Sequence, residues 1–189
     1  MGIFGSPEQK WIKSKQSAPW NRAFTSFTEY DAMVTKLMVW ECVNFADELL
    51  ASAFQAENQS LRVDTILLAK MQFYHLVTKS PTVHNLFYGY LFELFTNHYQ
   101  EDIETANLAI SQMRSREKWY LTWYYDYYNR TAGEYKDVLS QYCDDAARNK
   151  TTDGLPVLTS NKDQLQQQAA RGLMKMHQSF LIQCGAPQK

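Results

Sequence analysis

Along most of this chain, apolar side chains recur at steps of three and four residues, which is the spacing of one face of an α-helix. The first such stretch opens at the capping-box pattern Ser26-Phe27-Thr28-Glu29 and extends to about Glu57. A second stretch runs from Ser60 to about Lys79, and apolar residues cover more than half of its circumference. Because such a helix needs cover on most sides, we expect it to lie at the centre of the fold. The apolar face of the first stretch consists of Tyr30, Met33, Val34, Leu37, Met38, Phe45 and Leu49.

The sequence "KSPT" interrupts the pattern, and Pro81 is well placed as the first residue of a third helix. This helix carries the most apolar run of the chain, "NLFYGYLFELF" from Asn85 to Phe95. Gly89 lies within the run, although a glycine inside a helix costs up to ~1 kcal/mol relative to alanine. Close approach of another helix would explain that cost, so we expect a tight helix–helix contact at Gly89.

From Glu101 the helical spacing resumes and continues to about Asn129, either as one helix or as two with a break near Ser115. Its predicted inward face consists of Ile103, Ala106, Ile110, Met113, Tyr120, Tyr124 and Tyr128. The next helix follows the capping-box pattern Thr131-Ala132-Gly133-Glu134, with Tyr135, Val138, Leu139, Tyr142 and Ala146 on one face. The last opens at Ser160-Asn161-Lys162-Asp163, and its inward face consists of Leu165, Ala169, Leu173, Met176 and Phe180.

The pattern therefore predicts an all-α fold of six or seven helices, arranged as a single bundle or as a stacked array of helical hairpins. Residues 1–25 show no sustained period and are broken by Gly and Pro, so we predict an extended N-terminal arm. Residues 26–184 form the predicted all-α domain, and residues 185–189 form a short tail. The arm carries the large apolar side chains Trp11, Trp20 and Phe24, which are suited to docking on a protein surface.

Composition supports a folded helical chain. Hydrophobic residues make up 45% of the 189 positions, and only 7 Gly and 5 Pro are present. Charge is unevenly spread: residues 1–28 contain four basic and one acidic residue, residues 29–104 four and eleven, and residues 105–189 eleven and eight. An acidic middle section argues against nucleic-acid binding, which needs a broad basic surface. No apolar run reaches the ~20 residues of a membrane-spanning helix, which leaves only peripheral membrane contact open.

The three cysteines, Cys42, Cys143 and Cys184, are odd in number and widely spaced. The chain contains no C-x-x-C pair, so neither a zinc site nor a disulfide framework is expected. A reducing intracellular compartment is the simplest interpretation.

A helical enzyme or metal-binding bundle is the main alternative function. Glu41 and Glu48 lie on or beside the apolar face of the first helix, and Glu93 and His98 lie in and after the most apolar run. Di-iron bundles use such inward carboxylates, but with a Glu-x-x-His pair on one helical face. Glu93 and His98 are five residues apart and diverge by about 140°. We therefore expect no metal, no cofactor and no catalytic residue, and we expect these carboxylates to form hydrogen bonds or ion pairs.

The segment "WYLTWYYDYY", Trp119 to Tyr128, is the most unusual feature, since seven of its ten residues are aromatic. Tyr120 continues the inward face of the helix, whereas other aromatic residues of the segment form a second stripe about 100° around the helix axis. A helix that is aromatic on several sides needs several neighbours, so a protein–protein interface is favoured over a wide contact with the chain's own core. Base stacking and a lipid-headgroup contact are weaker alternatives. The predicted interface residues here are Trp119, Trp123, Tyr125 and Tyr127.

The first residues, Met1-Gly2-Ile3-Phe4-Gly5-Ser6, fit a template for N-terminal myristoylation, and three lysines follow. Pro7 comes directly after the template, where the pattern disfavours it. A lipid-anchored peripheral membrane protein is thus a third hypothesis.

The sequence favours a non-catalytic accessory subunit of a large multiprotein assembly, which docks on other subunits through its arm and its aromatic helix. Organellar energy-converting membrane complexes contain many such subunits, so a mitochondrial location is included in this expectation.

Overall fold

The computed structural model describes residues 30–55, 59–74, 81–129, 138–150 and 157–183. These ranges are all-α, as predicted, and contain no sheet. The predicted arm and tail lie outside the described residues. The helices are α2 (Tyr30–Ala53), α3 (Gln59–Met71), α5 (Pro81–Asn97), α6 (Ile103–Asn129), α7 (Val138–Arg148) and α8 (Lys162–Gln183).

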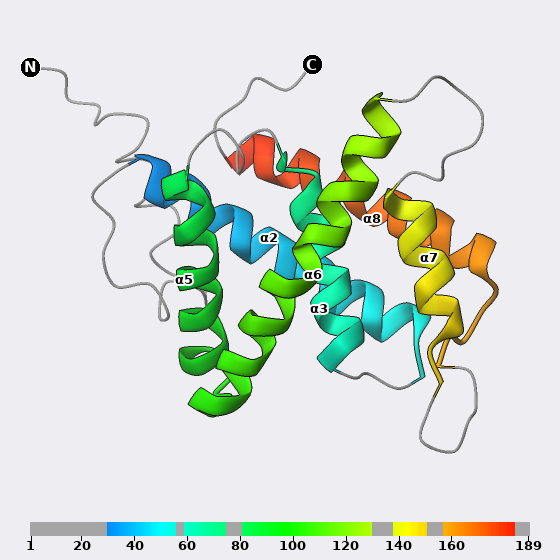
Figure 1. The fold of residues 1–189 in the computed structure, drawn as a ribbon, viewed down its shortest axis with the longest axis horizontal. Coiled ribbons are helices and arrows are strands. Elements are labelled where there is room, and N and C mark those ends of the chain that lie inside the picture. The colour runs from blue at the N-terminus through cyan, green and yellow to red at the C-terminus, as the bar shows by residue number, and fades with distance from the viewer. Residues whose placement is uncertain (1–29, 56–58, 75–80, 130–137, 151–156, 184–189) are drawn as a thin grey trace, which may run out of the picture.

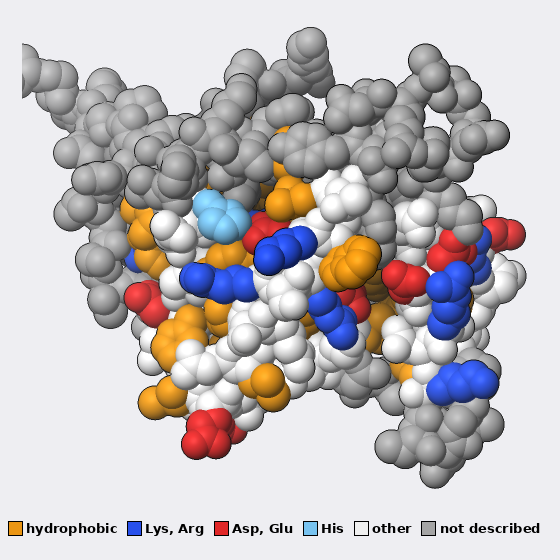
Figure 2. Space-filling view, in the orientation of Figure 1, with side chains coloured by type: hydrophobic (Ala, Val, Ile, Leu, Met, Phe, Trp, Pro, Cys, Tyr) orange, Lys and Arg blue, Asp and Glu red, His pale blue; other side chains and the backbone are white. Residues whose placement is uncertain are grey.

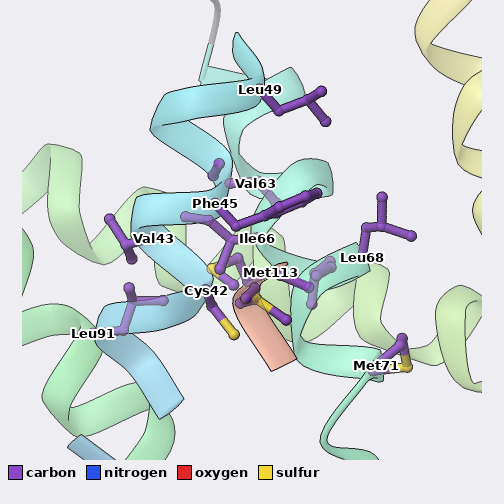
Figure 3. Close-up of a cluster of buried hydrophobic side chains, with 14 of the residues drawn as sticks. Cys42, Val43, Phe45, Leu49, Val63, Ile66, Leu68, Met71, Leu91 and Met113 are labelled. Atoms are coloured by element: carbon purple, nitrogen blue, oxygen red, sulfur yellow. The ribbon is translucent and has the colours of Figure 1, made fainter. Parts of the chain in front are cut away.

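The helices pack around a central pair, α2 and α3 (Figure 1). Helix α2 contacts α3, α5 and α8, whereas α3 also contacts α6 and α7. Helices α5 and α6 form a hairpin on one side of this pair, and α7 and α8 pack together on the other. One buried apolar cluster contains side chains from all six helices. Figure 3 shows its middle, where Cys42 and Phe45 of α2 lie beside Ile66 of α3 and Met113 of α6.

The helical periods predicted the buried faces of α3 and α8. Every residue from Ile66 to Met71 of α3 is buried, which confirms that this helix lies at the centre. The inward face predicted for α8 is confirmed at all five positions: Leu165, Ala169, Leu173, Met176 and Phe180.

Helix α2 ends at Ala53, four residues before the predicted end. The reason is a tertiary contact with the segment that precedes α8. Phe54 forms an isolated bridge with Leu158, and the Gln55 amide donates to the Val157 carbonyl at 2.9 Å. The backbone groups that would have continued the helix are used in this pairing instead.

Helix α6 is one continuous helix, so there is no break at Ser115. Asp102 caps its start: its carboxylate accepts from the Thr105 amide at 2.8 Å and from the Thr105 hydroxyl at 2.6 Å. The preceding turn closes through Gln100, whose φ of 57° lies in the left-handed region that glycine usually occupies. The Glu101 amide donates to the Phe95 carbonyl across this turn, which terminates α5.

The expectation of a tight contact at Gly89 is wrong. Gly89 is exposed, and a Cβ atom added there would meet nothing within 4 Å. The close approach occurs instead at Gly172 of α8, where an added Cβ would lie 2.8 Å from the Phe45 ring of α2. The apolar run around Gly89 reflects burial of its neighbours, such as Phe87 and Tyr88, and not of the glycine itself.

Candidate protein interface

Helix α6 presents two consecutive aromatic residues to opposite environments. Tyr120 is 3% exposed, and its hydroxyl donates to the Asp64 carbonyl of α3 at 3.1 Å. Trp119 is 66% exposed. The structure confirms the inward position predicted for Tyr120, whereas the assignment of Trp119 to an interface stays a prediction. Trp119 is therefore a large aromatic side chain that the described part of the chain leaves mostly uncovered.

Leu108 lies on the same outer side of α6 as Trp119 and is 52% exposed. Eleven residues separate the two, which is three helical turns to within about 20°, so they project in nearly the same direction about 16 Å apart. Ser111 and Ser115 lie between them and are exposed. We call the line Leu108–Ser111–Ser115–Trp119 the outer face of α6.

Charged residues border the outer face in an asymmetric way. Glu104 lies one turn before Leu108, whereas Arg114 and Lys118 lie beside Ser115 and Trp119. Figure 2 shows this side of the molecule: acidic groups lie at the lower end of α6, and basic groups gather around its middle beside apolar groups.

One expectation for α6 is wrong, and another stays a prediction. Ile103 was predicted to face inward, but it is exposed; it is the first residue of α6, and Ala106, one turn later, is the first that the core covers. Trp123, Tyr125 and Tyr127 belong to α6, but their side chains lie outside the description. Three further predicted interface residues, Trp11, Trp20 and Phe24, also lie outside the described residues.

A second group of exposed apolar side chains lies on α8 and consists of Met174, Leu181 and Ile182. Leu181 and Ile182 were not predicted from the sequence. They follow Phe180, which the helical spacing predicted to be buried and which is buried in the structure.

On its inner side, α6 is held against α3 by charged groups. Arg116 forms an ion pair with Asp64, and it donates to the Ser60 carbonyl at 3.1 Å and to the Ser60 hydroxyl at 2.6 Å. Glu117 forms an ion pair with Lys70, which is a fully buried side chain of α3. The outer face is thus carried by a helix that is fixed in rotation and in register.

The Lys70–Glu117 pair belongs to a larger buried cluster. Tyr88 of α5 donates to the second carboxylate oxygen of Glu117 at 2.6 Å. The Lys70 ammonium lies 4.1 Å from the centre of the Tyr88 ring and 4.6 Å from that of Phe87. Burial lowers the pKa of Lys70, and the Glu117 carboxylate opposes that shift. Both Glu117 oxygens therefore have partners, which a buried carboxylate requires.

His84 and Arg114 connect this cluster to the surface. The His84 Nε2 atom lies 3.7 Å from a Glu117 oxygen, and its side chain is 39% exposed. Partial burial lowers the pKa of His84, and the positive charge of Lys70 contributes in the same direction. The Arg114 guanidinium lies 4.9 Å from the centre of the Tyr88 ring. Because Lys70 already neutralises Glu117, Arg114 leaves this surface with excess positive charge.

The carboxylates of the metal-site alternative have separate partners. Glu41 is buried and accepts from Ser179 at 3.0 Å and from Gln183, both on α8. Glu48 pairs with Lys175 at the surface, and Glu93 interacts electrostatically with Lys36. His98 instead packs its ring against Trp40 and Tyr99. In the part of the chain that the structure describes, no three His, Cys, Asp or Glu side chains come together as metal ligands.

Among the described residues, clefts open at several helix junctions. One, of about 370 Å³, lies between α3 and the start of α6 and has Arg62 and Glu101 at its polar side. Another, of about 270 Å³, lies between α2 and α8 and is lined by Glu41, Lys175 and Gln183. In both clefts these charged groups already pair with other side chains.

Cys42 and Cys143 are both buried cysteines. Burial raises the pKa of the Cys42 thiol well above its ordinary value, which opposes formation of a reactive thiolate. Cys184 lies outside the described residues.

Over the described ranges, no helix combines the length and the apolar character that crossing a bilayer requires. No protein-family model matches the chain, and neither the curated proteins nor the solved structures show a significant match to it.

Proposed function

We propose that this protein is a non-catalytic accessory subunit of a multiprotein assembly, and that it binds a protein partner through the outer face of α6. The observation that carries the proposal is the exposure of Trp119, two thirds of whose surface is in contact with solvent. Tryptophan is among the residues that contribute most to binding energy when a partner buries them.

The inner side of α6 supports the same proposal. Arg116 and Glu117, three and two residues before Trp119 in sequence, are both paired with α3. A binding helix that is already ordered loses little conformational freedom on association. The outer face is therefore a prepared surface, and its flanking cations Arg114 and Lys118 are available for a partner's acidic groups.

The experiment is recovery of the tagged full chain from its native source under mild conditions, followed by sizing and mass spectrometry. We expect a complex larger than the chain alone, and we expect Trp119→Ala to lose the partner while circular dichroism remains unchanged. Met174→Ala is the matched control, because it truncates another exposed apolar side chain on a different helix. Recovery of a chain without partners, or full retention of the partner by Trp119→Ala, would contradict the proposal.

We propose in addition that the assembly is a mitochondrial energy-converting complex. Cell fractionation with the same tagged chain tests it separately, and recovery from another compartment would discard the location without affecting the interface.

A further inference from the structure

The outer face of α6 is complementary to itself when two copies of the helix lie antiparallel. We infer that a second copy of this chain binds there, so that α6 packs against α6 of the other copy about a two-fold axis near Ser111 and Ser115. The inference rests on the proposed function, since it names the partner of the same surface.

The apolar residues provide the first complementarity. Leu108 and Trp119 lie at nearly equal distances on either side of the midpoint between Ser111 and Ser115. An antiparallel pair with its axis at that midpoint places Leu108 of each copy opposite Trp119 of the other. The symmetric contact then buries the exposed Leu108 and Trp119 side chains of both copies, as in an isologous interface.

Charge provides the second complementarity. Glu104 and Lys118 border the outer face and form no ion pair with another described residue. Fourteen residues separate them, so they lie within about 40° of each other on one flank of the helix. A two-fold axis perpendicular to the plane of the two helices places the same flank of both helices on one side of the pair. It therefore brings Glu104 of each copy within about one helical turn of the other copy's Lys118.

In the antiparallel arrangement, the acidic start of α6 in one copy faces the basic second half of α6 in the other copy. A parallel pairing would set Lys118 against Lys118 and Glu104 against Glu104, which is repulsive. Because the contact is confined largely to one helix, we expect an association weaker than that of an obligate dimer and therefore dependent on concentration.

The first test is light scattering on the purified full chain between about 1 and 200 µM. The expected mass rises from the 22.1 kDa of one chain to twice that value. Trp119→Ala is expected to keep the chain at the lower mass throughout. A wild-type chain that stays monomeric over the whole range would overturn the inference.

The second test is a charge exchange. Lys118→Glu is expected to weaken dimerisation about tenfold, because two ion pairs are replaced by two repulsions. Adding Glu104→Lys restores opposite charges in the antiparallel arrangement, so the double variant is expected to dimerise nearly as well as the wild type. A double variant that is weaker than Lys118→Glu alone would contradict this register.

The third test is a cross-link that reports geometry. In a Cys184→Ser background, the pair Ser111→Cys with Ser115→Cys is expected to form disulfide-linked dimers under mild oxidation. The matched control is Gln167→Cys with Arg171→Cys, an exposed pair with the same spacing on α8, which is expected to remain monomeric. Equal cross-linking of both pairs, or none at the first, would exclude the proposed axis.

These outcomes separate the two proposals. A chain that is monomeric alone but binds a different protein through Trp119 would overturn the homodimer and leave the proposed function intact. A chain that does neither would overturn both.

Discussion

Lys70 of α3 and Glu117 of α6 form an ion pair inside the helical core, where Lys70 has no exposed surface and Glu117 is 7% exposed. Moving two charges out of water is costly, and their attraction offsets that cost only when other polar groups complete the site. The Tyr88 hydroxyl and the flanking aromatic rings supply those groups. The pair therefore specifies how α3, α5 and α6 fit together more than it stabilises the fold.

Removal of one partner from this pair is expected to destabilise the protein strongly. Lys70→Met leaves the Glu117 carboxylate buried without its cation, and we expect a loss of about 3–5 kcal/mol of unfolding free energy. Lys70→Met combined with Glu117→Leu removes both charges and should recover most of that loss. Urea denaturation of the two single variants and the double variant measures the coupling.

The matched control for that cycle is Lys175→Met, which breaks the ion pair between Lys175 and Glu48 at the surface. Because both side chains are exposed, we expect a change below about 1 kcal/mol. A cost for Lys70→Met no larger than that of Lys175→Met would contradict the role assigned to the buried pair.

His84 is expected to make stability depend on pH. Its pKa in the folded protein is lower than the ordinary 6.5, so the unfolded chain binds the proton more readily. Stability should therefore be lost as pH falls below about 6.5 and should be fully present above it. The neighbouring charges are Lys70 and Arg114, which oppose protonation, and Glu117, which favours it.

The measurement is the urea midpoint at about pH 7.5 and about pH 5 for the wild type and for His84→Gln. Other groups titrate in this range, so the difference between the two proteins is the quantity to compare. We expect the variant to lose less stability on acidification. An equal loss in both proteins would show that His84 does not contribute.

The sequence predicted the helices and their buried faces because each depends on local spacing, as the five inward positions of α8 illustrate. It did not predict the Lys70–Glu117 pair, since residues 47 positions apart carry no local signal of contact. The end of α2 was missed for a similar reason, because Phe54 leaves the helix to pair with Leu158. Trp119 could be assigned to the outer face because Tyr120 fixes the rotation of α6.

Trp119 and Tyr120 provide a direct test of core against interface. Trp119→Ala is expected to change the unfolding free energy by less than about 1 kcal/mol, because the indole is mostly in water. Tyr120→Ala removes a buried ring and its hydrogen bond to Asp64, and we expect a loss of about 3–5 kcal/mol. Thermal or urea denaturation of the monomer distinguishes them. Comparable losses would place Trp119 in the core.

Gly172 and Gly89 form a matched pair of helical glycines with opposite expectations. At Gly172 an added Cβ would lie 2.8 Å from the Phe45 ring, so alanine must displace α8 or the ring. Such overpacking costs about 1–3 kcal/mol, and the higher helix propensity of alanine returns up to about 1 kcal/mol. Gly172→Ala is thus expected to lose up to about 2 kcal/mol, and Phe45→Leu in the same chain should reduce that penalty.

At Gly89 the space around the added Cβ is open, so only the gain in helix propensity remains. Gly89→Ala is expected to stabilise the protein by about 0.5–1 kcal/mol. Urea denaturation of the two single variants decides whether the close approach of α2 and α8 limits the size of the side chain that position 172 can hold. Equal stabilisation by both substitutions would show that Phe45 yields freely, and that the contact at Gly172 places no demand on the sequence.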